Sequence, residues 1–465
     1  MGKPEEMEAT IAAIATPPGR GGIGIIRISG IKAKEILRTI FRPRRATSDF
    51  KSHRLYYGWI VDPQGNIELD EVLAVFMAAP ATYTREDVVE IHCHGSYILL
   101  QNILHLILTL GVRLADPGEF TKRAFLNGRI DLTRAEAVLD VIGAKTSTGL
   151  RMAIPQLHGE LFQRMEALRQ TLIEVRAIFE VAIDFPDDEQ EILAVSALTD
   201  RLRQEVEEPV SELIIACEQG RIFREGISLV ILGRPNVGKS SLLNTLLQEE
   251  RAIVTSVPGT TRDTIEEYFT IKGVPVRLID TAGIREPSEA IEEIGIRKAR
   301  ERLFTADAVL LVLDASAPLT LEDQEIMAMM GEKPVLLVIN KMDLVDRVEP
   351  GHYARLFPGK PFVCISVKEN QGITALEEAL FELVVGREKA FEPPSSIAPN
   401  FRHQVALTNA LAAIRAVRAG LLVGLTPDLL AIDLQAALDH LGDIVGETTP
   451  EDILKQIFSQ FCLGK

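Results

Sequence analysis

The sequence predicts a multidomain protein that combines α/β and all-α domains. Between residues 223 and 385, apolar runs of strand length alternate with helical patterns, as a parallel-rich sheet with helices on both faces requires. Before and after that region the sequence is rich in Ala, Leu, Glu and Arg, which is the composition of long helices. An α/β domain is therefore expected between two helical stretches.

Four segments follow from these patterns. Residues 1–125 mix strand and helix patterns and predict a separate α+β domain, whereas residues 126–222 are helical. Residues 223–385 form the α/β domain, and residues 386–465 become helical again after a linker rich in Pro and Ser. Because the termini of a domain usually lie close together, a whole domain is easily inserted into another. We expect the two helical segments to pack as one discontinuous domain.

Composition and charge are those of an ordinary globular protein. Of 465 residues, 46% are hydrophobic and 25% are charged, no apolar run has membrane-spanning length, and the N-terminus resembles no targeting peptide. We therefore expect a cytoplasmic protein that enters no membrane. The net charge of −16 disfavours a chain that grips nucleic acid over its whole surface, although residues 1–125 carry 15 Lys or Arg against 14 Asp or Glu.

A glycine-rich motif defines the ligand of the α/β domain. Residues 233–240, GRPNVGKS, fit G-x-x-x-x-G-K-[ST], a turn whose backbone N–H groups wrap phosphates. The apolar run 227–232 precedes it and a helical pattern over 241–247 follows, so a chance glycine turn is the weaker interpretation. Lys239 is expected at the β- and γ-phosphates, and the Ser240 hydroxyl on Mg²⁺.

Two further motifs indicate guanine. Asn340-Lys341-Met342-Asp343 follows an apolar run, and an Asp carboxylate there can accept from both N1–H and the exocyclic amine of guanine. Alone, it would be read as a polar turn. However, Asp280-Thr-Ala-Gly283 lies in between and suits Mg²⁺ and γ-phosphate contacts. The ordered motifs resemble those of the GTPase superfamily, with a Ras-like domain, and Ser366-Val367-Lys368 resembles its weaker guanine-contacting motif.

Three segments outside the α/β domain identify a narrower family. They are ATPPGRGGIGIIRISG at 15–30, PGEFTKRAFLN at 117–127 and FCLGK at 461–465, and they resemble the MnmE (TrmE) family of tRNA-modification GTPases. The likeness covers the whole chain. It implies that the N-terminal domain binds a one-carbon donor, 5-formyltetrahydrofolate or 5,10-methylenetetrahydrofolate, and mediates a homodimer.

The resemblance also implies a reaction and a partner. With the FAD protein MnmG, in a heterotetramer or larger complex, such a chain adds an aminomethyl or carboxymethylaminomethyl group to C5 of the wobble uridine of certain tRNAs. The folate-binding residues implied are Arg27, Glu90, Arg129 and Lys465. Arg129 departs from the family, which can have Lys there, and this changes the geometry although not the charge. Without the resemblance, Arg27 and Glu90 would be read as strand residues in ion pairs.

The hydrolytic machinery differs from that of Ras-type enzymes. Ile284 stands where those enzymes keep a water-orienting Gln, so another group must position the attacking water. The family implies Glu292, whose alternative is a solvent-facing carboxylate beside Glu293. It also implies a K⁺ ion between the β- and γ-phosphates, completed when two nucleotide domains dimerise. The K⁺ ligands implied are Asn236, Thr255, Val257 and Thr260, and Thr261 would join Ser240 on Mg²⁺.

The expected GTP or GDP contacts share these motifs and the loop 255–261. They are Asn236, Val237, Gly238, Lys239, Ser240, Ser241, Thr255, Ser256, Val257, Pro258, Gly259, Thr260, Thr261, Asp280, Thr281, Ala282, Gly283, Asn340, Lys341, Asp343, Ser366, Val367 and Lys368.

Three features keep two interpretations each. The basic cluster Arg42–Arg45 with Lys51 and Arg54 can contact phosphates, but a solvated loop is favoured. Cys462 invites a nucleophilic role, yet nothing nearby obviously lowers its pKa, so a structural Cys is at least as good a reading. His92-Cys93-His94 lacks further metal ligands, and a structural role is favoured.

Two other classes of GTPase compete with this assignment. A ribosome-assembly GTPase of the Era or EngA kind would share the central domain but end in a basic RNA-binding module, whereas this chain ends in acidic helices and has no second P-loop. A self-assembling membrane GTPase would need an amphipathic basic helix or a transmembrane span, and the sequence has neither pattern.

Overall fold

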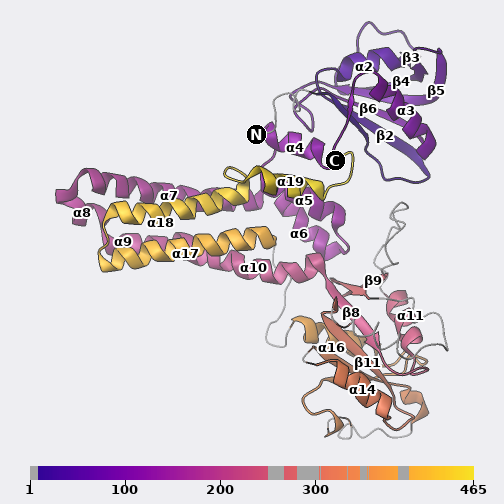
Figure 1. Cartoon of the computed structure of the whole chain (residues 1–465), viewed down its shortest axis with the longest axis vertical. Helices are drawn as coiled ribbons and strands as arrows, with labels where there is room; N and C mark the ends of the chain where they lie inside the picture. The colour runs from indigo at the N-terminus through magenta and orange to yellow at the C-terminus, as the bar shows by residue number, and fades with distance from the viewer. Residues whose placement is uncertain are drawn as a thin grey trace.

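The computed structural model describes residues 9–249, 267–279, 303, 305–331, 333–345, 353, 355–385 and 397–465. The N-terminal and α/β domains lie apart, and the helical domain lies between them and extends to one side as a long arm (Figure 1). The predicted site residues within 255–261 and 280–284, and the predicted catalytic residue 292, lie outside the described residues. The multidomain fold class, α/β with all-α, is confirmed.

The N-terminal domain is built on one seven-stranded sheet of order β3-β4-β5-β6-β2-β1-β7. Helices α2 (Ala33–Ile40) and α3 (Tyr97–Thr109) cover one face of it, where their aliphatic side chains pack on alternate residues of the strands. Over part of the opposite face, α4 (Glu119–Leu126) packs Phe120 on β1. The strands are β1 (Ile11–Ile14), β2 (Gly21–Ser29), β3 (Phe41–Pro43), β4 (Arg54–Asp62), β5 (Ile67–Met77), β6 (Val88–Gly95) and β7 (Arg113–Leu114).

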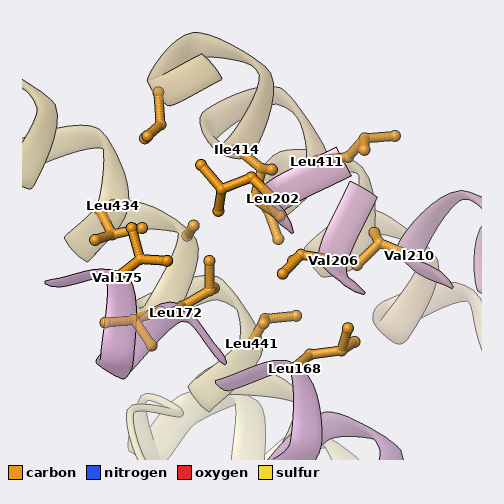
Figure 2. Close-up of a cluster of buried hydrophobic side chains, with 14 of the residues drawn as sticks. Leu168, Leu172, Val175, Leu202, Val206, Val210, Leu411, Ile414, Leu434 and Leu441 are labelled. Atoms are coloured by element: carbon orange, nitrogen blue, oxygen red, sulfur yellow. The ribbon is translucent and has the colours of Figure 1, made fainter. Parts of the chain in front are cut away.

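The helical arm joins chain segments from both sides of the α/β domain. Residues of α7, α9, the π-helical segment η2 (Arg203–Glu207) and α10 share one core with residues of α17 and α18, as Figure 2 shows for Leu172, Val206, Ile414 and Leu434 among others. The helices are α5 (Leu132–Gly143), α6 (Ser147–His158), α7 (Glu160–Asp184), α8 (Glu189–Leu193), α9 (Val195–Leu202), α10 (Glu208–Glu225), α17 (Phe401–Val423), α18 (Pro427–Val445) and α19 (Glu451–Ser459).

Helix α17 is long and apolar enough to cross a membrane by length and composition alone. Its buried residues Leu407, Leu411, Ile414, Val417 and Leu421 belong to the helical core. Burial inside the arm thus explains part of the apolar character of α17.

The α/β domain contains a six-stranded sheet of order β13-β12-β11-β8-β10-β9. All neighbouring strands pair in parallel except β9, which is antiparallel to β10. The elements are β8 (Ile227–Leu232), α11 (Lys239–Glu249), β9 (Glu267–Ile271), β10 (Val274–Leu278), β11 (Ala308–Asp314), α14 (Leu321–Met329), β12 (Val335–Asn340), β13 (Phe362–Cys364) and α16 (Ile373–Val385). Every residue of β8 and β12 is buried, as expected for central strands covered on both faces.

The chain enters and leaves the α/β domain at one place. It enters from α10 through Gly226 into β8, and it returns through buried Ile397 and Ala398. The Ala398 carbonyl accepts hydrogen bonds from Gln156 Nε2, at 2.8 Å, and from the Arg224 guanidinium. Both connections are therefore fixed to α6 and α10 of the helical arm.

Candidate functional site

The glycine-rich turn lies where β8 ends and α11 begins. Gly233 (φ +146°) and Gly238 (φ +101°) both have backbone conformations that side chains disfavour. A Cβ on Gly238 would overlap the side-chain amide of Asn340, and one on Gly233 would overlap the Val312 carbonyl. Glycine is thus required at both positions for the turn to pass this close to β11 and β12.

Lys239 is held over this turn by its own backbone. Its Nζ donates to the carbonyl of Gly233 at 2.7 Å and to that of Arg234 at 2.6 Å. Burial lowers the pKa of Lys239, because a desolvated ammonium is disfavoured. A half-buried cation that donates to two backbone carbonyls at the mouth of an N–H-lined turn suits an incoming polyphosphate.

The side-chain amide of Asn340 connects three of the predicted motifs. The residue is 3% exposed, and its Nδ2 donates to the Val237 carbonyl at 2.8 Å. The backbone N–H of Val367 donates to its Oδ1 at 3.2 Å. The turn 233–240 and the segments 340–343 and 366–368 therefore form one hydrogen-bonded unit.

Asp343 is oriented as a guanine acceptor would need to be. Ser366 Oγ donates to its Oδ1 at 2.8 Å, and Lys368 Nζ lies 3.7 Å from Oδ2. The Ser366 hydrogen bond, and then the Lys368 charge, lower the pKa of Asp343. The carboxylate is therefore ionised at neutral pH and can only accept hydrogen bonds. Beside it, Lys341 has a left-handed backbone (φ +64°) and pairs with Asp314 at 2.6 Å.

The predicted folate residues meet on the N-terminal sheet. Arg27 on β2 and Glu90 on β6 are register partners, with 2.9 Å between Nε and Oε1. Arg27 and Arg129 both lie over the ring of Tyr83, at 5.8 and 4.8 Å from its centroid. Nε2 of His92 is buried 3.6 Å from Glu90 and has no hydrogen-bond partner in the described part of the chain. An orphaned polar atom beside this pair suits a polar ligand.

The C-terminal tail folds back onto this cluster. The Lys465 carbonyl accepts from the Phe120 N–H at 3.1 Å, and the Gly464 carbonyl lies 3.4 Å from the Arg27 Nη1 that donates to it. Gly464 (φ +88°) leaves no room for a Cβ, which would overlap the Ile14 carbonyl. The structure thus brings Arg27, Glu90, Arg129 and Lys465 together from both ends of the chain. Cys462 is exposed, and its carbonyl lies 3.4 Å from the Lys465 N–H that donates to it.

Comparisons with known proteins identify the family of this chain. The family model of the MnmE helical domain matches residues 132–462, and that of the GTP-binding protein TrmE N-terminus matches residues 10–129. A tRNA modification GTPase MnmE from Desulfotalea psychrophila is 50% identical over 460 residues, 98% of each chain. The chain belongs to the MnmE (TrmE) family. The MnmE of Geobacter sulfurreducens is 47% identical over 459 residues, 99% of this chain and all of that one.

Solved structures match this chain over 34–40% of its length. The G domain of the Thermotoga maritima FeoB iron transporter is 31% identical and covers 34% of this chain and 98% of its own, with a TM-score of 0.26. Aquifex aeolicus Era bound to GDP and aluminium fluoride is 27% identical and covers 40% and 66%, with a TM-score of 0.28. The family assignment rests on the full-length relatives.

Several residues of these two sites were not predicted from the sequence. Arg234 Nε lies 2.9 Å from the carboxylate of Asp323, which also caps α14 together with Thr320. The sequence Thr320-x-x-Asp323 before a helix is a capping signal, but nothing in it indicates that Asp323 also pairs with Arg234 of the phosphate-binding turn. Tyr83 and His92 were likewise missed as neighbours of the folate residues. Among the described residues, no group of three or more His, Cys, Asp or Glu side chains that could hold a metal ion was found, around His92 and His94 or elsewhere.

Proposed function

We propose that this chain is the GTP-hydrolysing component of an enzyme that modifies the wobble uridine of certain tRNAs. As a member of the MnmE family the chain is a GTPase that takes part in tRNA modification, with tRNA as substrate. The observation that supports GTP binding and hydrolysis is the position of the Asn340 side-chain amide, which is hydrogen-bonded both to the phosphate-binding turn and to the base-binding segment. Such preorganisation is what a guanine-specific switch needs.

The roles of the nucleotide residues follow from their chemistry. Asp343 accepts from the guanine edge, and Lys239 leaves the turn carbonyls to bind the β- and γ-phosphates. Ser240 and Thr261 would hold Mg²⁺, which neutralises charge that develops on the phosphates. The proposed GTP or GDP contacts also include Val237, Gly238, Ser241, Thr255 to Thr261 and Asp280 to Gly283.

The attacking water and the transition-state charge need further groups. We infer that Glu292 orients the water and that K⁺ supplies positive charge between the phosphates, with Asn236, Thr255, Val257 and Thr260 as its ligands. The exposed side chain of Asn236 at a left-handed position (φ +64°) of the turn supports this role, because its amide oxygen is free to face a cation. Dimerisation of two nucleotide domains would complete the K⁺ site.

The N-terminal cluster suits a tetrahydrofolate. The cations Arg27, Arg129 and Lys465 fit its glutamate tail, and Glu90 fits the hydrogen-bond donors of the pterin edge. The orphaned Nε2 of His92 adds a polar group to this proposed site. The one-carbon donor would be 5-formyl- or 5,10-methylenetetrahydrofolate.

The proposed assembly contains a homodimer of this chain and the FAD protein MnmG, located in the cytoplasm. The acidic balance of the chain supports a division of labour in which MnmG contributes most of the charge that binds tRNA. The domain division 1–125, 126–222, 223–385 and 386–465 is proposed on the same basis.

Nucleoside analysis of tRNA tests the proposal. Deleting the gene should remove the C5-modified wobble uridine, and the wild-type chain should restore it, whereas a Lys239→Ala chain should not. If the nucleoside persists and ribosomal subunits accumulate as precursors, the chain is a ribosome-assembly GTPase of the Era or EngA kind. The K⁺ role has its own assay: GTP hydrolysis should be faster in K⁺ than in Na⁺ at equal ionic strength, and equal rates would remove the ion from the mechanism.

A further inference from the structure

The face of the N-terminal sheet opposite α2 and α3 has a stripe of arginine and aromatic side chains (Figure 1 shows the sheet). We name Arg42, Arg44, Tyr57 and Trp59 the Arg–aromatic stripe. Arg44 lies 5.6 Å from the Tyr57 ring centroid and Arg42 lies 5.7 Å from that of Trp59. The two rings are 5.8 Å apart. The stripe is thus a continuous row in which two neighbouring aromatic rings are flanked by an arginine at each end.

The stripe points to solvent. Arg42 and Trp59 are register partners on β3 and β4, and the neighbouring partners Phe41 and Ile60 point into the helix-covered core. Arg44 is exposed, Tyr57 is 37% exposed, and half of the Arg42 side chain is accessible. Arg42 pairs with Glu68, but Arg44 and the adjacent exposed Arg45 have no carboxylate partner within the described residues.

The stripe adjoins the proposed folate cluster on the same sheet face. Tyr57 on β4 opposes Leu73 on β5, and Leu73 opposes His92 on β6. His92 in turn lies beside Glu90. Since neighbouring strands are about 4.8 Å apart, the Tyr57 backbone is roughly 10 Å from that of His92. A nucleotide held on Tyr57 would therefore sit roughly 10 Å from the proposed folate cluster.

We propose that the Arg–aromatic stripe binds unpaired nucleotides of the tRNA substrate, and that it presents the target base to the folate cluster. The inference rests on the proposed function. Proteins recognise single-stranded RNA loops by stacking bases on exposed aromatic rings and on arginine planes, and they bind the backbone through cations. The stripe supplies both groups on a chain whose net charge is −16, so a local cluster of exposed arginines beside aromatic rings stands out as a place for RNA contact.

The chain contains its own probe for this contact. Trp59 is its only tryptophan, so intrinsic tryptophan fluorescence reports on the stripe alone. Titrating the full-length chain with a tRNA anticodon stem-loop at low salt should quench this fluorescence in a saturable way, because a stacked base quenches an indole. A double-stranded RNA of the same length and without a loop should quench it far less.

Substitutions then separate stacking from charge. Tyr57→Leu should weaken stem-loop binding by about tenfold, the usual scale for loss of one stacked base, while Tyr57→Phe should bind normally. Arg44→Glu should weaken binding by at least about tenfold and make it less sensitive to salt. Arg164→Glu, the same charge change on an exposed position of α7, is the matched control and should bind within about twofold of wild type.

The outcomes are distinct. A saturable quench that Tyr57→Leu and Arg44→Glu weaken, and Arg164→Glu does not, supports the proposal. The proposal is overturned if no quench occurs, or if both stripe variants bind the stem-loop as the wild type does. It is also overturned if Tyr57→Leu changes from dimer to monomer in sedimentation while its RNA affinity is unchanged, because the stripe would then be an interface between copies of the chain. Normal GTP hydrolysis and folate binding in the same preparation separate this failure from failure of the proposed function.

Discussion

The nucleotide site and the proposed folate site are assembled in opposite ways. The nucleotide residues follow β8, β12 and β13, and the carboxyl ends of parallel strands in one sheet bring such loops to a common edge. Asn340 then joins them by hydrogen bonds. The folate cluster instead joins Arg27 to Gly464 across 437 residues, through a tail that returns past the helical arm.

This difference has a physical consequence. The α/β domain carries its described nucleotide residues on one sheet with its own buried core, so this site depends little on the rest of the chain. The folate cluster depends on the helical domain, because α19 and the tail must reach Phe120 and Arg27. Damage to one site should therefore leave the other intact, and the predictions below test that independence in order of decreasing effect.

Asp343→Asn should produce the largest change. The amide keeps one acceptor oxygen but loses the charge and turns an N–H donor towards a guanine donor. One charged contact of about 1.5–3 kcal/mol is lost and an unpaired donor costs about 1–3 kcal/mol, so GTP affinity should fall by roughly a thousandfold. Xanthosine triphosphate should become the preferred nucleotide, because the amide can donate to its additional carbonyl. Fluorescent-nucleotide titration measures both affinities, and calorimetry should show unchanged folate binding.

Asp428→Asn is the control for this variant, because Asp428 is an exposed carboxylate at the start of α18. It should bind GTP normally. A preserved preference for GTP in Asp343→Asn would remove Asp343 from the base-binding site.

Removal of residues 462–465 should affect the opposite site. It deletes the carbonyl partners of Arg27 and of the Phe120 N–H together with the Lys465 charge. Folate binding should weaken by about ten- to a hundredfold, as expected for one charge-assisted contact, and tRNA modification should be lost. GTP hydrolysis should continue. Lys465→Ala separates the side chain from the tail backbone, and unchanged calorimetric affinity in both variants would exclude the tail from the folate site.

The two sites also differ in how much the sequence could predict. The strand before residues 233–240 and the helix after it follow from local patterns, and the structure has both, as β8 and α11. Arg27 with Glu90 is a register pair, and register depends on the whole sheet, so only the family resemblance indicated it. Contacts such as Arg234 with Asp323 have no sequence signal, since the partners meet only after β8 and α14 have packed.

A buried polar joint in the helical arm should give a smaller, pH-dependent effect. The Asn400 N–H donates to His403 Nδ1 at 3.1 Å, and His403 Nε2 lies 2.7 Å from Glu136, so the imidazole carries one proton, on Nε2. Arg402 also pairs with Glu136. Burial lowers the pKa of His403 below its usual 6.5. Burial opposes ionisation of Glu136, but His403 and Arg402 outweigh it and lower that pKa.

The sign follows from these shifts. Below pH 6.5 the unfolded His403 takes up a proton that the folded one does not, so the folded state loses stability as pH falls towards the folded pKa. From pH 7 to pH 5.5 the free energy of unfolding of the helical arm should fall by about 1 kcal/mol. His403→Gln should lose this dependence in urea titrations at the two pH values. If the free energy of unfolding of His403→Gln depends on pH as that of the wild type does, a group other than His403 causes the loss of stability.

Lys145→Ala should have the smallest effect. This variant tests most directly whether the nucleotide and folate sites are independent, because Lys145 lies where the α/β domain contacts the helical domain. Lys145 Nζ is 4.0 Å from the Tyr268 ring centroid, and Thr148 packs on Gly273, so the β9–β10 hairpin rests on the start of α6. An exposed cation–π contact contributes about 0.5–1 kcal/mol, so amide hydrogens of the hairpin should exchange about two- to fivefold faster. Lys145→Arg, which keeps a cation over the ring, should exchange like wild type. GTP and folate affinities should each stay within about twofold, since neither cluster contains Lys145. If Lys145→Ala shifts either affinity by more than about fivefold, the two sites are coupled through this hairpin, and the hypothesis that they are independent is wrong.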